Sequence, residues 1–137
     1  MTPDQLSALH ARAFPRDRHW SADEFRDLLA SPGIFIETTQ SGFALGRVVL
    51  DEAELIMIAV APGAQRKGVG RGLLCRFEAS AQAKGALVCH LEVAADNVSA
   101  LSLYQATGYT QSGCRPGYYR RPNAAGVDAV MMFKNLT

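Results

Sequence analysis

The segment of this 137-residue sequence with the clearest chemical potential is a run of glycines and cations, Gln65-Arg66-Lys67-Gly68-Val69-Gly70-Arg71-Gly72. It follows an apolar strand-like run and precedes an amphipathic helical pattern, so its backbone N–H groups would lie at a helix N-terminus, where an anion is favoured. Three glycines keep Cβ atoms away from such an anion, and three cations stand beside it. The segment predicts a phosphate-binding turn, although a tight turn with solvated charges would have the same composition.

Two other phosphate-binding loops are excluded by the spacing of these glycines. A Walker loop requires GxxxxGK[ST], and Gly63 and Gly68 have the first spacing, but Val69 occupies the lysine position. A Rossmann fingerprint requires GxGxxG, and Gly68-Val69-Gly70 is followed by Gly72 instead of a glycine at position 73. Neither nucleotide hydrolysis nor dinucleotide binding is predicted.

Two residues further along the chain could take part in proton transfer. Glu92 would share a strand face with His90, where a partly desolvated carboxylate has a raised pKa and can accept a proton; the alternative is a solvated carboxylate at a strand edge. Tyr104 falls two turns into a helical pattern, and its hydroxyl could donate a proton to a leaving group. The alternative for Tyr104 is a core aromatic side chain on an amphipathic helix.

Hydrophobic periodicity and capping residues predict the elements that position these groups. The predicted order is helix, helix, three strands, helix, strand, helix and two strands, which is typical of one α/β or α+β layer fold. The strands are expected over residues 34–39, 43–50, 54–60, 86–93, 109–114 and 127–133. The helices are expected to begin at Thr2, Ser21, the glycine-rich turn and Asp96 or Asn97, and to end near Phe14, Ser31, Gly85 and Gly108. The first three strands should form an antiparallel meander, and residues 115–126 should form a loop.

The composition is that of an ordinary globular protein, with 48% hydrophobic and 20% charged residues. The length suits one domain over residues 1–137. Lys and Arg total 14 against 13 Asp and Glu, so no global field favours nucleic acid or an anionic membrane as a partner. No apolar stretch approaches the ~20 residues that span a bilayer, and no signal segment is evident, so a cytoplasmic protein is expected.

The cysteines and histidines predict neither a disulfide framework nor a metal site. Cys75, Cys89 and Cys114 are odd in number and lack CxxC spacing, which favours free thiols in a reducing compartment. Cys89 should be a core residue instead of a nucleophile, because it would share one face of a strand with Leu87 and Leu91. The three histidines show no ligand spacing, so we expect no metal cofactor.

Several motifs together resemble those of the GNAT N-acetyltransferases. Gln65, Gly68 and Gly70 match the family signature Gln/Arg-x-x-Gly-x-Gly/Ala, and Ile58-Ala59-Val60 precedes it as in those enzymes. A downstream run resembles the pattern LEVxxxNxxAxxLYxxxGF of the RimI-like, ribosomal-protein-alanine N-acetyltransferase type; it comprises Leu91-Glu92-Val93, Asn97, Ala100, Leu103-Tyr104 and Gly108-Tyr109. The likeness extends over nearly the whole chain, because it also includes Asp51-Glu52-Ala53, Ala13-Phe14-Pro15 and Tyr118-Tyr119.

The chain departs from the RimI-like pattern in three places. No strand is predicted before the first helix, where such enzymes usually have one. Met57 stands where the pattern often has a polar residue, and Arg16-Asp17-Arg18-His19 separates Pro15 from Trp20. The last two departures border the region where an acceptor would bind.

The resemblance implies a GNAT fold, with a mixed but mostly antiparallel sheet flanked by helices and the first strand absent, and acetyl-CoA as co-substrate. In that family two strands splay apart and the pantetheine arm lies between them, bonded here to the backbone of Ile58 and Val60. Asn97 would contact the arm, or would only cap its helix. The implied cofactor-binding residues are Ile58, Ala59, Val60, Gln65, Arg66, Lys67, Gly68, Val69, Gly70, Arg71, Gly72, Asn97 and Tyr104.

The resemblance also implies direct acetyl transfer to a primary amine, with Glu92 and Tyr104 as the catalytic pair. In RimI-like enzymes the acceptor is the N-terminal alanine of a small-subunit ribosomal protein, so an acceptor peptide or protein N-terminus, such as that of a ribosomal protein, is the expected partner. An α-amino group has a pKa of ~8 and a lysine ~10.4, so a modest base suffices for an N-terminus. Trp20, Tyr118 and Tyr119 are the expected acceptor contacts, although both tyrosines could serve packing alone.

Two rival functions remain at this stage. The first is acetylation of a small amine, because this superfamily changes acceptors readily and a fold does not determine a substrate. An acidic, closed acceptor pocket would favour it, whereas an open groove flanked by Tyr118 and Tyr119 would favour a peptide. The second is a non-catalytic acyl-CoA-binding module, against which the presence of both Glu92 and Tyr104 argues.

Overall fold

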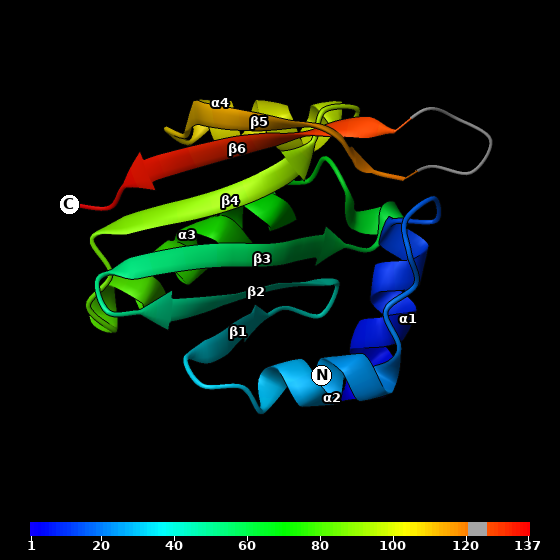
Figure 1. The fold of residues 1–137 in the computed structure, drawn as a ribbon. Helices are drawn as coiled ribbons and strands as arrows, with labels where there is room; N and C mark the ends of the chain where they lie inside the picture. The colour runs from blue at the N-terminus through cyan, green and yellow to red at the C-terminus, as the bar shows by residue number, and fades with distance from the viewer. Residues whose placement is uncertain (121–125) are drawn as a thin grey trace.

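Six strands form one sheet in the order β1-β2-β3-β4-β6-β5, with helices on both of its faces (Figure 1). The computed structural model describes residues 1–120 and 126–137. In chain order the elements are α1 (Pro3–Ala13), α2 (Ala22–Leu29), β1 (Ile34–Thr38), β2 (Gly42–Val49), β3 (Glu52–Val60), α3 (Val69–Ala83), β4 (Val88–Ala94), α4 (Val98–Ala106), β5 (Thr110–Tyr119) and β6 (Val127–Asn135). The predicted order of helices and strands is confirmed.

The sheet is mixed but mostly antiparallel. Strands β1, β2 and β3 form the predicted antiparallel meander. Strand β4 lies parallel to β3, and helix α3 makes the crossover that a parallel pair requires. Strand β6 then pairs antiparallel with both β4 and β5. The expected fold class is confirmed.

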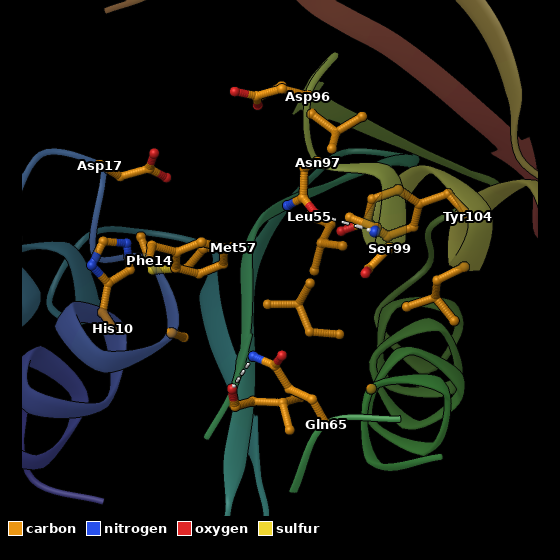
Figure 2. Close-up of a pocket in the computed structure, with 18 of the residues that line it drawn as sticks. His10, Phe14, Asp17, Leu55, Met57, Gln65, Asp96, Asn97, Ser99 and Tyr104 are labelled. Carbon is orange, nitrogen blue, oxygen red and sulfur yellow. Dashed lines mark hydrogen bonds between the residues drawn. The ribbon is translucent and has the colours of Figure 1, made fainter. Parts of the chain in front are cut away.

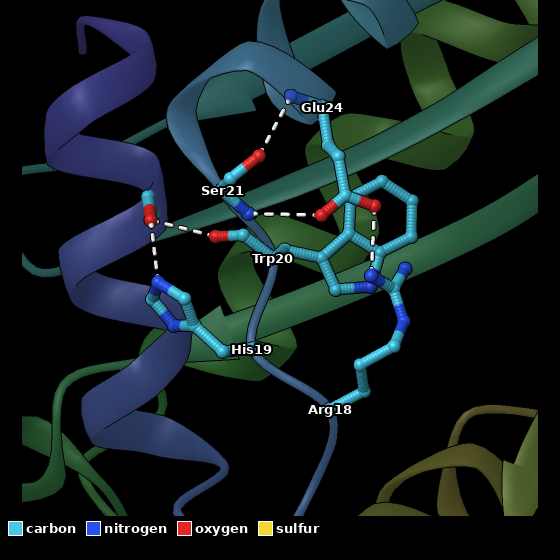
Figure 3. A network of polar contacts seen from close by, with 6 residues as sticks. Arg18, His19, Trp20, Ser21 and Glu24 are labelled. Atoms are coloured by element: carbon cyan, nitrogen blue, oxygen red, sulfur yellow. Dashed lines mark hydrogen bonds and ion pairs between the residues drawn. The ribbon is translucent and has the colours of Figure 1, made fainter.

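The first two helices begin at the predicted capping residues. Thr2 accepts a hydrogen bond from the backbone N–H of Gln5, and the Ser21 hydroxyl accepts one from Glu24 at 3.1 Å, each within a complete capping box. Figure 3 shows the second box together with the Arg18–Glu24 ion pair of 2.8 Å, which holds the segment between α1 and α2. The Trp20 backbone carbonyl in the same segment accepts a hydrogen bond from Ser7 at 2.6 Å.

The two faces of the sheet bury separate cores. Helix α3 contributes Leu73, Leu74 and Phe77 to one core, which also contains the fully buried Cys89. Helices α1 and α2 cover the other face of β1 to β3 with a cluster that includes Phe25. Burial raises the pKa of the Cys89 thiol, so the prediction that this cysteine is a core residue is confirmed. All three cysteines are free.

The C-terminal strands differ from the prediction. Residues 115–119 were expected in a loop, but β5 continues to Tyr119. Pro116 and Gly117 favour a loop locally; β5 lies at the edge of the sheet, where a proline is tolerated, and its register with β6 shifts between Arg115 and Tyr119. The rest of the expected loop includes residues 121–125, which lie outside the described residues.

The strand β4 also begins later than expected. Leu87 precedes it, stays half exposed and bonds through its backbone N–H to the Asp51 carbonyl at 2.7 Å, so it does not share the buried face of Cys89 and Leu91. Among the helices that the structure describes, none is long and apolar enough to cross a membrane.

Candidate active site

The strands β3 and β4 separate halfway along their length. They pair over residues 52–55 and 88–91, whereas residues 56–60 and 92–94, all of them described, are not paired with one another. A bulge lies at the point of separation, because Met57 pairs with Leu45 while Leu55 pairs with Gly46, which leaves Ile56 as an extra residue. The backbone of β3 beyond the bulge therefore has a free edge toward β4. The splayed strands that the resemblance implied are present.

A cleft of about 640 Å³ opens at this separation. Figure 2 shows β3 crossing it: Tyr104 lies on the side of α3 and α4, and His10, Phe14 and Met57 lie on the side of α1. The cleft therefore passes through the sheet and connects its two faces. From the predicted site, its lining includes Ile58, Val60, Gln65, Arg66, Gly68, Gly70, Arg71, Glu92, Asn97, Tyr104, Trp20 and Tyr119.

The glycine-rich turn forms one end of the cleft, at the N-terminus of α3. Gly68 is the N-cap with φ +81°, and Arg66 also has a positive φ of 62°. A Cβ atom at Gly68 or Gly72 would meet nothing within 4 Å, so the space beside the turn is open. The first N–H groups of a helix have no partner within it, and here they face that space beside Arg66 and Arg71. The turn fits the diphosphate of coenzyme A.

A side-chain hydrogen bond ties this turn to the free edge of β3. The Gln65 amide donates to the Val60 carbonyl at 3.1 Å, as Figure 2 shows. Four of the predicted cofactor residues do not line the cleft: Lys67 and Gly72 are exposed beside the turn, Val69 packs against the core, and Ala59 is buried toward α1 and α2.

Asn97 caps α4 and also borders the cleft. Its side-chain oxygen accepts a hydrogen bond from the Ala100 backbone N–H at 3.2 Å, so the capping interpretation is confirmed. Its amide NH₂ makes no hydrogen bond within the described residues, which leaves two donors for a ligand.

Glu92 extends from the half of β4 that has left β3. Its side chain is 30% exposed and forms an ion pair of 3.2 Å with Arg115 of β5. The neighbouring Leu91 and Val93 point into the core, as the strand alternation predicted. Arg115 was not foreseen as a partner because it was expected in a loop. Glu92 also borders a second hollow of about 360 Å³ on the open face of the sheet, so it is reachable from two sides.

Tyr104 lies opposite, on α4, with 5% of its surface exposed. Its ring packs edge-on against Tyr109 at 5.7 Å, and its hydroxyl makes no hydrogen bond to any described residue. Burial raises the pKa of Tyr104 well above its usual value, so the phenol remains protonated. A protonated hydroxyl without a protein partner, in the wall of a cleft, is available as a hydrogen-bond donor to a ligand.

The α1 end of the cleft contains residues that the sequence interpretation did not assign. His10, Phe14 and Asp17 come from α1 and the segment after it, and Asp96 follows β4. Arg16 and Asp96 approach to 3.9 Å across this end. His10 had been considered among the three histidines that lack ligand spacing, and Phe14 as a helix end and as part of a family motif.

The predicted acceptor contacts divide between the inside and outside of the cleft. Trp20 and Tyr119 line it, whereas Tyr118 is 52% exposed, packs on Tyr119 and lies under the Arg115 guanidinium at 5.3 Å. The described residues contain no group of His, Cys, Asp and Glu side chains placed to hold a metal ion.

A cleft through splayed strands, with a glycine-rich turn and cations at one end, is compatible with an acyl-CoA-dependent transferase. Residues 3–109 match the model of the acetyltransferase (GNAT) family, and the chain belongs to this family, whose enzymes use acetyl-CoA as co-substrate. It is 37% identical, over 96% of this chain and 90% of the relative, to the [ribosomal protein bS18]-alanine N-acetyltransferase of Escherichia coli (strain K12). It is 38% identical, over 93% and 83%, to the N-alpha-acetyltransferase RimI of Mycobacterium tuberculosis. The protein is an N-acetyltransferase.

Solved structures agree with this assignment. The crystal structure of the ribosomal-protein-S18-alanine N-acetyltransferase from Escherichia coli superposes with a TM-score of 0.82 at 30% identity, and the match covers 100% of this chain and 90% of that one. Naa20 of Chaetomium thermophilum, in complex with a bisubstrate analogue, has the same fold with a TM-score of 0.79 at 23% identity, over 98% and 84% of the two chains.

The turn gives a first prediction. We expect Gly68→Val to lower acetyl-CoA affinity at least about 10-fold, because its side chain would occupy the open space beside the helix N-terminus and displace charge-assisted hydrogen bonds. Isothermal titration calorimetry measures the effect. The positive φ of Gly68 adds backbone strain of about 1–2 kcal/mol.

Gly85→Val is the matched control, because Gly85 also has a positive φ of 98° and open space around its Cβ position, yet it lies at the far end of α3. This variant should lose stability and keep its affinity. Equal acetyl-CoA affinity in the two folded variants would show that the diphosphate does not bind at the turn.

Proposed function

We propose that this enzyme transfers the acetyl group of acetyl-CoA directly to the N-terminal α-amino group of a protein or peptide. One observation carries the proposal: a single cleft joins the anion-binding turn to the α1 face of the sheet, and Glu92 and Tyr104 both line it. All the strands that the structure describes belong to one sheet, which supports a single domain over residues 1–137.

The free edge of β3 suits the pantetheine arm. Backbone groups of Ile58 and Val60 would pair with the two amides of the arm as an added strand would, while the diphosphate lies at the turn from Arg66 to Gly72. The free amide NH₂ of Asn97 adds a hydrogen-bond donor in the same cleft. The thioester would then lie between Tyr104 and the gap toward the α1 face.

In the reaction the acceptor nitrogen attacks the thioester carbonyl, the C–S bond breaks and the amide C–N bond forms. Glu92 takes the proton of the acceptor amine, directly or through water, and the Tyr104 hydroxyl hydrogen-bonds the departing sulfur. We infer direct transfer, and the positions of the cysteines support it. None lines the cleft within the described residues: Cys89 is in the core, and Cys75 and Cys114 are exposed elsewhere.

The acceptor chemistry favours an α-amino group over a lysine. At neutral pH an amine with a pKa of ~8 is deprotonated at little cost, whereas one near ~10.4 requires a far stronger base. Glu92 is 30% exposed and engages Arg115. A carboxylate is in general a modest base, and it suits the less demanding substrate. The relatives named above support a ribosomal protein as the acceptor.

Acidic residues at the acceptor end favour a second candidate, a small amine. Asp17 and Asp96 both line that end, and Tyr118 does not flank it. Carboxylates beside an acceptor cleft would attract a polyamine or a similar small cation, and Arg16, 3.9 Å from Asp96, reduces this attraction.

The test is a panel of peptides that differ in the first residue, incubated with acetyl-CoA beside polyamines and amino acids, with products identified by mass spectrometry. We expect acetylation at the α-amino group of peptides, at a kcat/KM well above that of any small amine. Acetylation confined to small amines, or to lysine side chains, would contradict the proposal.

A further inference from the structure

His10 has an unusual environment for a polar side chain. It lies on α1 with 5% of its surface exposed, and its Nδ1 is the one buried side-chain nitrogen or oxygen, among the described residues, that has no hydrogen-bond partner. Its nearest aromatic neighbours are Phe14 and Phe25, with ring centroids at 5.1 and 6.1 Å. The acetyl-transfer steps above make no use of this residue.

An unpaired imidazole in a core is costly, since a buried polar group loses its hydrogen bonds to water and gains none. His10, however, also lines the cleft, where Figure 2 shows it beside Phe14 and Met57. Burial lowers the pKa of His10 and is the largest effect on it, whereas the charge of Asp17 acts in the opposite direction. The ring is therefore neutral at neutral pH. A neutral imidazole offers one donor and one acceptor nitrogen.

We propose that His10 selects the first residue of the acceptor, and that it selects a hydroxyl side chain, serine or threonine. This inference rests on the proposed acetylation of protein N-termini. The acceptor amine must stand in the gap beside Glu92, so the side chain of the first residue extends toward the α1 face, where His10, Phe14 and Met57 line the cleft.

The chemistry of the walls points to a hydroxyl. A hydroxyl both donates and accepts, so it can pair with an imidazole nitrogen in either tautomer. An alanine methyl group would leave the imidazole unpaired, so this chain should differ in its preferred first residue from the alanine N-acetyltransferase of Escherichia coli. A large first side chain would meet Phe14 and Met57, which line the same part of the cleft.

Matched peptides test the proposal on the unmodified enzyme. Peptides identical except for Ser, Ala, Thr or Val at the first position are compared by kcat/KM; Thr and Val have nearly equal volumes and differ in the hydroxyl. We expect Ser to exceed Ala, and Thr to exceed Val, by about 10-fold or more, the effect of one buried hydrogen bond. Equal rates within both pairs would overturn the inference while leaving N-terminal acetylation intact.

A variant tests the residue. His10→Phe should lower kcat/KM for the Ser peptide about 10-fold and bring the Ser:Ala ratio close to one. His90→Phe is the control, because His90 lies outside the cleft on the open sheet face, paired with Glu52 at 3.0 Å, and it should keep the wild-type ratio. A preserved ratio in folded His10→Phe would overturn the assignment. Failure of every peptide, with small amines acetylated, would instead reject the proposed function and this inference together.

Discussion

Replacing Tyr104 by phenylalanine should lower kcat by about 10²-fold or more and leave acetyl-CoA affinity nearly unchanged. The ring stays, so the packing against Tyr109 and the wall of the cleft are kept. Only the hydroxyl is lost, and it acts on the leaving sulfur more than on the bound cofactor. Single-turnover acetylation, combined with calorimetry, separates the chemical step from binding.

The environment of Tyr104 refines its role. A thiol has a pKa near ~8.5 and an ordinary phenol ~10, and burial raises the pKa of Tyr104 further. Full proton transfer from the phenol to the thiolate is therefore uphill. Most of the benefit should come from a hydrogen bond to the developing thiolate, and the pH–rate profile should show no tyrosine limb.

Tyr109→Phe is the matched control for Tyr104→Phe. The Tyr109 hydroxyl donates to Glu78 at 2.8 Å inside the core, away from the cleft, so its loss should cost about 1 kcal/mol of stability and leave kcat unchanged. If Tyr104→Phe ran at the wild-type single-turnover rate, with any defect confined to KM, Tyr104 would be a packing residue and not a hydrogen-bond donor to the leaving sulfur.

Replacing Glu92 by glutamine should lower kcat/KM by about 10²-fold or more at neutral pH, because the acceptor amine then has to lose its proton without a positioned base. The defect should shrink as the pH rises through ~8, since an α-amino group becomes neutral in bulk solution there. Rates of the two enzymes on one peptide, measured across this pH range, give the comparison.

Glu54→Gln is the control for Glu92→Gln. Glu54 forms a similar ion pair on the same open face, 3.3 Å from Arg47, but it does not line the cleft. Its replacement should leave the pH profile unchanged. A Glu92→Gln defect of equal size at every pH would assign Glu92 a positioning role and would leave the base unidentified.

Local patterns were sufficient to predict most of the fold. A capping residue followed by a proline predicted the start of α1, and a capping box of two residues three apart in sequence predicted the start of α2. The apolar run of β3 predicted a strand, and the glycine-rich turn predicted an anion site at a helix N-terminus. Each of these signals depends on neighbours along the chain.

Features that depend on long-range pairing were missed. Pro116 and Gly117 indicated a loop, and only the position of β5 at the sheet edge allows them in a strand. The Arg115–Glu92 ion pair and the bulge at Ile56 arise from the register of separate strands. The place of His10 in the cleft depends on how α1 packs against β3, since helical periodicity alone assigns it to an apolar face.

The most direct test of the central claim is a crystal structure of the enzyme with coenzyme A joined covalently to the α-amino group of a Ser-initiated peptide. We expect the diphosphate at residues 66–72, the pantetheine along the free edge of β3, the joined nitrogen between Glu92 and Tyr104, and the serine side chain against His10. A peptide moiety that leaves the cleft away from α1, or a diphosphate bound away from the turn, would contradict the claim.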